Sequence, residues 1–501
     1  MINQRRRLPC FVFVRVTSWI VTARGNPIHE ITRNDTESRN AKPNQLVSVA
    51  AEQTANLLPR QAELKRQIGL RTATALVVGE VIGVGIFLTP AGMAKSLGSP
   101  AWLLIVWLVM GAMAACGALC YGELAARYPE AGGSYVYLRE AFGKPVAFLY
   151  GWMALLVMDP GLTAALAVGM AGYVGYIFNL SPLEIKAVAV TAILLLAVIN
   201  IRGIRPGAWL LWRLTILKLG LLSFLLLWGF GLQLGRWSNF SPFIAQRAGS
   251  APLPGALAAA LVAAFFSFGG WWDVTKVAGE VRNPGRTLPR ALIYGVLIVT
   301  LVYVLTSAVF LYLVPLDTVT SGEIFAAQAG NVLFGRAGGQ VFAAIVAVTV
   351  LGSLAAIIMS APRVYFAMAR DGLFVPAAAL LDPRFGTPAR TIALQAVLAS
   401  ILVALGSFNQ IISYFIFVAV IFVALTVAAL FVMRRKQVET VGYLTPGYPI
   451  TPIVFLLLVG LLLLLLASNN PKQSLLGLGV VALGIPVYYL SFRNSSPRTE
   501  Q

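Results

Sequence analysis

Two short segments inside long apolar runs could bind a charged ligand through their backbones. The segments are GVGIF at 83–87 and SFGGW at 267–271. Glycines in the middle of a helix are costly unless the helix breaks there. At such a break, free N–H groups at a new helix N-terminus favour an anion, and free carbonyls at the preceding C-terminus accept from a cation. The two polarities together suit a zwitterion such as an α-amino acid.

The expected ligand contacts follow from the polarity of each break. Gly83 to Gly85 would receive a carboxylate, and carbonyls of the residues around each break would accept from an ammonium: Val81, Ile82, Phe266 and Ser267. No charged side chain is required for this recognition. The alternative for the glycines is close packing of membrane helices.

Aromatic residues crowd the second segment and could line a side-chain pocket or form a gate. They are Phe265, Phe266, Phe268, Trp271 and Trp272. Aromatic residues in membrane helices also serve as packing or belt residues. We assign a binding role to Phe266 and Trp271.

Ionisable residues within apolar runs are expensive and often functional. Lys218 lies deep in one such run and could act as an internal cation or carry a proton. Glu80 lies about one turn before the first break, and Asp159 precedes Pro160. The alternative is a structural ion pair between Lys218 and one of these two carboxylates. Two further acidic residues, Asp273 and Glu280, are expected near the cytoplasmic end of their helix.

Other chemistries find little support in the residues. The single histidine, His29, cannot build a His-based metal site alone, and Cys116 and Cys120 are interpreted as small core residues. There is no H-E-x-x-H, G-x-S-x-G or P-loop pattern, so we expect no catalytic residues, no metal and no cofactor. An integral membrane enzyme is therefore the disfavoured alternative.

Composition places the chain in a lipid bilayer. Of 501 residues, 58% are hydrophobic and 11% are charged, against about 25% charged in soluble domains. The formal net charge of +19 comes from Lys and Arg between apolar runs. This pattern is typical of the positive-inside rule and not of a nucleic-acid-binding surface.

The apolar runs predict an all-α membrane protein with about twelve spans. Arg and Lys concentrate in alternate loops, which predicts a multi-pass protein of the cytoplasmic (inner) membrane with both termini in the cytoplasm. The spans are expected near 70–94, 101–126, 145–175, 183–201, 208–232, 255–279, 290–314, 339–369, 390–406, 409–433, 450–467 and 474–492.

Three regions follow from this assignment. Residues 1–68 form a basic cytoplasmic tail, expected to be mostly disordered. Residues 69–493 form the membrane domain, and residues 494–501 a short cytoplasmic tail. The breaks fall in spans one and six, at matching positions of two five-helix halves, as in transporters built from inverted repeats.

Four further motifs carry a family resemblance from about residue 68 to the end. The chain is similar to amino acid permeases of the amino acid–polyamine–organocation superfamily, in particular the L-type amino acid transporter-like branch. The motifs are GEVIGVGIFLTP at 79–90, YGELAARYPEAGGSYVYLREAFG at 121–143, GEVRNPGRTLPRAL at 279–292 and RVYFAMARDGLFVP at 363–376, with GTPAR at 386–390; FSFGGW at 266–271 indicates the branch.

The resemblance implies a five-plus-five inverted-repeat fold with two extra helices. It implies that Lys218 occupies the place where sodium-coupled relatives hold an ion. Val84 stands where a small or hydroxyl residue is frequent, and Trp272 where a smaller polar residue is frequent, so side-chain specificity does not transfer. The implied substrate contacts are Gly83, Val84, Gly85, Phe266, Ser267, Gly269 and Trp271.

The resulting hypothesis is a secondary active transporter of amino acids that works by alternating access. It would be sodium-independent, either proton-coupled or an exchanger. A transporter of another organic amine or an amino-sugar conjugate in the same superfamily is the main alternative. The partners of this protein would be the small amino acid substrate and the lipid bilayer. The sequence leaves open its protein partners and the identity of the amino acid.

Overall fold

The computed structural model is an all-helical bundle over the part of the chain that it describes. These residues are 64–316, 330, 332–333, 335–405, 408–436, 442–469 and 471–492. The predicted tail up to residue 63 and the C-terminal residues 493–501 lie outside them. The principal helices are α3 (Leu70–Val81), α4 (Gly85–Leu97), α5 (Pro100–Arg127), α6 (Ser134–Phe142), α7 (Lys144–Met153), α8 (Asp159–Phe178), α9 (Pro182–Ile201), α10 (Ile204–Gly231), α11 (Leu253–Phe268), α12 (Pro284–Leu313), α14 (Gly338–Ser360), α15 (Pro362–Arg370), α16 (Ala389–Leu405), α17 (Phe408–Arg435), α18 (Ile450–Asn469) and α19 (Pro471–Ser491).

The predicted spans correspond closely to these helices. Ten helical stretches in the described residues are long and apolar enough to cross a membrane. The broken pair α3 and α4 and the shorter apolar helix α16 supply two more candidates, in agreement with the expected twelve. The all-α multi-pass prediction is therefore confirmed.

Both predicted breaks are present. Helix α3 ends at Val81 and α4 begins at Gly85, with irregular backbone between them. Helix α11 ends at Phe268, and a 3₁₀ helix, η5 (Trp271–Glu280), follows Gly269 and Gly270. Gly270 has φ = +102°, a conformation that glycine adopts without the penalty of a Cβ atom.

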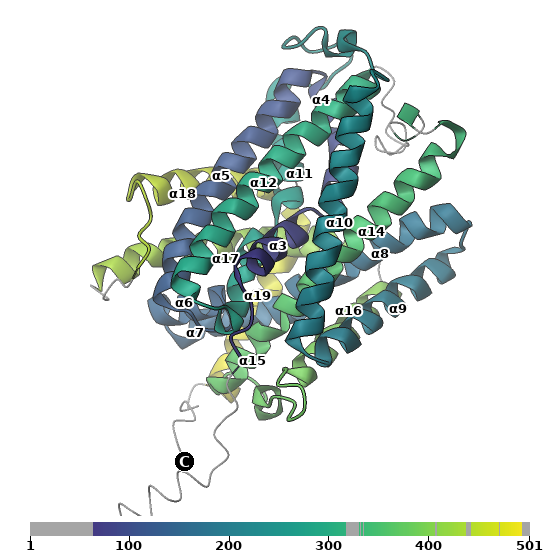
Figure 1. Cartoon of the computed structure of the whole chain (residues 1–501). Helices are drawn as coiled ribbons and strands as arrows, with labels where there is room; N and C mark the ends of the chain where they lie inside the picture. Colours follow the sequence, from purple (N-terminus) through teal and green to yellow (C-terminus); the bar gives the residue numbers. More distant parts are fainter. Residues whose placement is uncertain are drawn as a thin grey trace, which may run out of the picture. The chain divides into compact units, whose positions relative to one another are not determined.

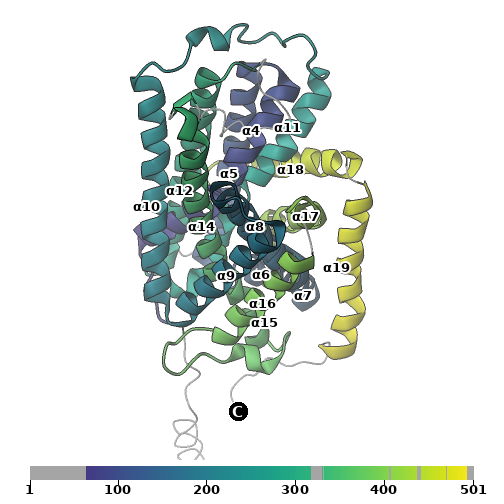
Figure 2. The same cartoon turned by 90° about the vertical axis from the view of Figure 1, so that its right-hand side faces the viewer.

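The broken helices are enclosed by long unbroken ones. Helix α12 packs against α5 and α3, and α14 packs against α8 and α10 (Figure 1). The last two helices, α18 and α19, pack on α17 at the edge of the bundle (Figure 2). The buried residues form one continuous apolar core in which the two breaks lie.

A short backbone bridge joins the chain before α3 to the end of η5. The N–H groups of Gln67 and Ile68 both donate to the Glu280 carbonyl at 2.8 Å, and the Arg282 N–H donates to the Ile68 carbonyl at 2.8 Å. Ile68 and Val281 thus form an isolated parallel bridge. The end of the predicted tail is therefore part of the folded structure at Gln67 and Ile68.

A deviation in the third span precedes Asp159. A π-helical turn, η3 (Ala154–Met158), separates α7 from α8. Pro160 has no N–H to donate to the preceding turn, which explains the local change of helix type. The turn directs Met158 and Asp159 into the cavity described next.

Candidate functional site

A cavity lies between the two breaks, and residues of α8 and α17 also line it. Its wall combines backbone of the breaks with apolar side chains and three carboxylates. The lining residues are Glu80, Val81, Gly83, Val84, Gly85, Met158, Asp159, Leu162, Leu166, Phe265, Phe266, Ser267, Gly269, Gly270, Trp272, Asp273, Ile416 and Ala419. Most of the sequence-predicted binding residues are therefore brought together around one space.

The two breaks touch at Gly85. A Cβ atom on Gly85 would stand 2.8 Å from the Ser267 Cα and 2.7 Å from its hydroxyl oxygen. Thr89, one turn along α4, lies 2.9 Å from the same hydroxyl and donates to the Gly85 carbonyl at 3.0 Å. At the start of α4 the Phe87 N–H donates to the Val84 carbonyl at 3.2 Å, whereas the N–H groups of Gly85 and Ile86 have no backbone acceptor among the described residues and are available to an anion.

Tyr303 of α12 connects the two breaks from behind. Its buried hydroxyl lies 2.7 Å from the carbonyl oxygen of Val81 and 2.7 Å from that of Ser267. The single hydroxyl proton of Tyr303 is thus shared between a carbonyl in the last turn of α3 and one in the last turn of α11. Nothing in the sequence around Tyr303 singles it out, because its role depends on the packing of α12 against both breaks.

Lys218 is fully buried on α10, with its ammonium at the end of α3. It donates to the Gly79 carbonyl and the Ser353 hydroxyl at 2.9 Å each, and also to the Ile82 carbonyl. Three donors meet three neutral acceptors, from α3, the break and α14. Lys218 therefore connects α3 and the first break with α14, and the structure shows no ion pair between Lys218 and Glu80 or Asp159 in the part of the chain that it describes.

Two of the four carbonyls expected to receive a substrate ammonium already accept two hydrogen bonds each. The Val81 carbonyl accepts from Tyr303 and from the Gly83 N–H at 2.7 Å. The Ile82 carbonyl accepts from Lys218 and from Ser353. Ile82 also lies outside the cavity lining. The carbonyls of Phe266 and Ser267 each accept one bond in the described residues, which leaves each a lone pair.

The tryptophan that lines the cavity is Trp272 and not Trp271. Trp271 is 2% exposed and packs edge-to-face on Tyr121 of α5, with ring centroids 5.1 Å apart. Trp272 and Phe266 line the cavity. Neighbouring residues point in different directions from a helix, and the backbone conformation of the break at Gly270 decides which of the two enters the cavity.

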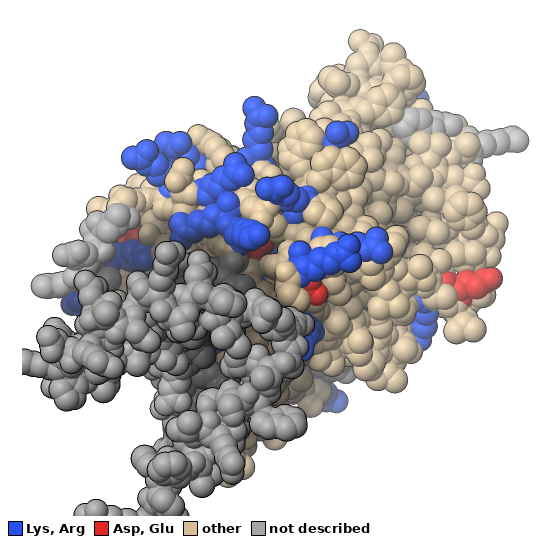
Figure 3. All heavy atoms as spheres, turned by 60° about the horizontal axis from the view of Figure 1, so that its bottom comes forward, with Lys and Arg blue, Asp and Glu red and all other residues tan. Residues whose placement is uncertain are grey.

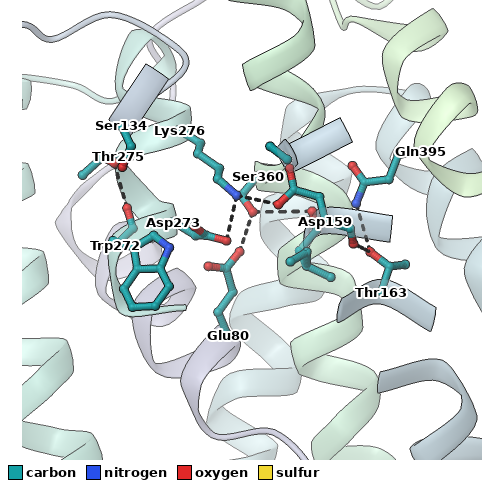
Figure 4. Close-up of polar contacts among 12 residues, drawn as sticks. Glu80, Ser134, Asp159, Thr163, Trp272, Asp273, Thr275, Lys276, Ser360 and Gln395 are labelled. Atoms are coloured by element: carbon teal, nitrogen blue, oxygen red, sulfur yellow. Dashed lines mark hydrogen bonds and ion pairs between the residues drawn. The ribbon is translucent and has the colours of Figure 1, made fainter. Parts of the chain in front are cut away.

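A cluster of buried charges forms one wall of the cavity. Lys276 of η5 donates to Asp159 at 2.9 Å and to Asp273 at 3.0 Å. Glu80 accepts a hydrogen bond from Ser360 of α14 at 2.5 Å. Figure 4 shows the three carboxylates arranged around Lys276 and Ser360. All four ionisable side chains are buried.

The charge cluster continues into α8 and α15 through neutral groups. Tyr365 donates to the second oxygen of Asp159 at 3.0 Å. Thr163 donates to the Asp159 carbonyl at 2.6 Å and accepts from Gln395 of α16 at 3.0 Å. Asp159 is therefore held in a fixed orientation by neighbouring groups of α8, α15 and η5.

Glu280 belongs to a separate pair. It accepts from Arg363 of α15 at 2.8 Å, and both side chains are buried. The sequence predicts only that Asp273 and Glu280 lie near a helix end. In the structure both side chains are buried. Lys276 is not among the residues predicted from the sequence, although a Lys three residues after an Asp in the continuation of a broken span is a usable signal.

The comparisons with known proteins agree with this architecture. The family model for amino acid permeases matches residues 68–486. The serine/threonine exchanger SteT of Bacillus subtilis is 32% identical over 432 residues, which cover 85% of this chain and 97% of that protein. The mouse large neutral amino acids transporter small subunit 2 is 30% identical over 442 residues, 85% of this chain and 81% of that protein. The rabbit b(0,+)-type amino acid transporter 1 is 30% identical over 388 residues, 76% of this chain and 79% of that protein. With two broken helices facing one cavity and a family match over most of its length, this chain belongs to the amino acid permease family.

Proposed function

We propose that this chain is a sodium-independent secondary transporter that moves amino acids across the cytoplasmic membrane by alternating access. The observation that carries the proposal is the pair of helix breaks facing one cavity. The free N–H groups at Gly85 suit an α-carboxylate, and the remaining carbonyl capacity at Phe266 and Ser267 suits an α-ammonium. Irregular backbone at membrane depth is tolerated where it lines such a cavity.

Lys218 supports independence from sodium. Its ammonium bonds two carbonyls and one hydroxyl, the type of oxygen ligands that a bound cation takes. With a fixed positive charge at this position, the end of α3 needs no second cation. The charge can either stay in place during exchange or lose and regain a proton in a coupled cycle.

Transport by purified protein in proteoliposomes tests the proposal. Uptake of a panel of labelled amino acids and organic amines is measured with Na⁺ or with choline outside, at constant pH and membrane potential. We expect uptake of at least one amino acid, unchanged by choline. Empty and amino-acid-loaded vesicles then separate coupled uptake from exchange. Uptake of amines alone would favour the second candidate substrate class, and collapse without Na⁺ would contradict the assignment of Lys218.

A further inference from the structure

Three carboxylates face the cavity, and among the described residues the Lys276 ammonium is the one cation that contacts them. Lys276 is shared between Asp159 and Asp273, whereas Glu80 has the Ser360 hydroxyl as its partner. Other buried cations nearby are engaged elsewhere: Lys218 bonds neutral oxygens, and Arg363 pairs with Glu280. The cluster therefore places three carboxyl groups beside one ammonium, in a setting where uncompensated charge is costly.

Two carboxyl oxygens of the cluster lack a hydrogen-bond partner among the described residues. Glu80 Oε2 and Asp273 Oδ1 are both buried, and neither has a hydrogen-bond donor among the described residues. Glu80 is 8% exposed and Asp273 2% exposed. Both residues line the cavity, and Figure 4 shows their carboxylates on one side of Lys276. Buried carboxylate oxygens without a donor mark a position that a cationic group would satisfy.

We propose that Glu80 and Asp273 form a cation subsite that binds a second positive charge on the substrate, such as the side-chain ammonium or guanidinium of a basic amino acid. This inference rests on the proposed function, since the α-carboxylate and α-ammonium are placed at the breaks. It adds a substrate class that backbone recognition alone does not specify.

The position of Glu80 fits a long basic side chain. Glu80 lies in the last turn of α3 and Gly83 in the irregular backbone just after it, and both residues line the same cavity. A basic side chain that extends from the break along this wall therefore meets Glu80. The cavity wall also includes Met158, Phe266 and Trp272, which suit methylene groups and provide aromatic rings in the same cavity as the cation.

A matched pair of ligands tests the subsite without any mutation. Lysine and norleucine share a backbone and a four-carbon side chain, and differ in the terminal ammonium. We expect purified wild-type protein to bind lysine roughly tenfold to a hundredfold more tightly than norleucine, the range for hydrogen bonds to charged groups. Arginine and citrulline form a second pair with the same expected order.

The variant Glu80→Gln removes the charge and retains a group that can bond Ser360. We expect it to lose most of the preference for lysine while norleucine binding changes little. Glu184→Gln is the control, because Glu184 is an exposed carboxylate that caps α9 and lies outside the cavity lining. It should keep the wild-type preference.

The possible outcomes separate the subsite from the transport proposal. Tighter or equal binding of norleucine by wild-type protein overturns the cation subsite and leaves amino acid transport standing. Binding of neither ligand, nor of any amino acid in the uptake panel, contradicts transport itself. A norleucine affinity that depends on pH in the wild type and not in Glu80→Gln would assign the site to a proton and also overturn the subsite. If Glu80→Gln fails to fold, the two wild-type ligand pairs still decide the question.

Discussion

Single side chains fix the ends of the broken helices in this molecule. A helix C-terminus leaves its last carbonyls without intrahelical donors. Here Lys218 and Ser353 serve the Ile82 carbonyl, and Tyr303 serves those of Val81 and Ser267. The breaks are thus held from behind by donors of α10, α12 and α14, while the cavity side remains open to a ligand.

Removing the Lys218 ammonium should strongly reduce transport. In Lys218→Met the side-chain volume is retained, but the Gly79 and Ile82 carbonyls lose their cationic donor. We expect the uptake rate to fall by a factor of up to about a hundred, since the buried Gly79 carbonyl is left without its donor, at a cost of about 1–3 kcal/mol, and the Ile82 carbonyl keeps only Ser353. Uptake per inserted molecule in proteoliposomes measures this.

Lys186→Met is the matched control. Lys186 also donates to a backbone carbonyl, that of Ala404, but it does so at the surface. Its replacement should leave uptake unchanged. If Lys218→Met only lowered the yield or the melting temperature, and the surviving protein transported normally, Lys218 would have a purely structural role.

At the scale of helices, the breaks depend on close contact as much as on free backbone groups. Gly85 is the point at which α4 touches the last turn of α11, and a side chain there meets backbone and cannot be accommodated by rotation alone. A Cβ atom on Gly269, in contrast, would have no neighbour closer than 3.4 Å. Gly85 therefore permits close contact between the breaks, whereas the positive φ at the second break belongs to Gly270 and not to Gly269.

A single methyl group should test the role of the contact at Gly85. Gly85→Ala places a Cβ atom 2.8 Å from the Ser267 Cα and must separate the breaks. We expect substrate affinity to fall at least tenfold, by about 1.4 kcal/mol or more. Gly92→Ala in the same helix is the control, since nothing lies within 4 Å of its Cβ position. Equal affinities of the two variants, measured by direct binding, would show that the contact at Gly85 has no part in recognition.

The helices can be predicted from the sequence in more detail than the site. Length and hydropathy locate a span, and glycine pairs locate a break, because both effects are local to the chain. Contacts between helices are not local. The sequence does not single out Lys276 and does not distinguish Trp272 from Trp271, since both depend on how η5 turns after Gly270. The environment of Lys218 is easier to anticipate, because a lone lysine in an apolar run needs acceptors wherever it lies.

For the molecule as a whole, the distribution of charge favours one orientation. The face at which α15 ends carries many Lys and Arg side chains and few Asp and Glu (Figure 3). This agrees with the loops that the positive-inside rule assigns to the cytoplasm. We expect a reporter that works only in the cytoplasm to be active when it is fused to the C-terminus. Activity of a reporter that works only on the opposite side would contradict twelve spans with two cytoplasmic termini.

The basic N-terminal tail should be dispensable up to residue 60. It has no spanning run, and its composition does not favour a packed core. Deletion of residues 1–60 should preserve uptake per inserted molecule. Deletion of residues 1–69 should impair it, because that variant also loses the hydrogen bonds of Gln67 and Ile68 to Glu280. Impaired uptake by the shorter deletion, at normal membrane levels, would reveal a function of the tail.

The bridge between Ile68 and Val281 also limits how the cavity can open. It fastens the start of α3 to the end of η5, so these two half-helices would tilt as one rigid body and would not separate at their outer ends. A disulfide between cysteines replacing Ile68 and Val281, in a chain cleared of its native cysteines, should therefore leave turnover intact. Loss of turnover on oxidation and its recovery on reduction would show instead that the two half-helices part during each cycle.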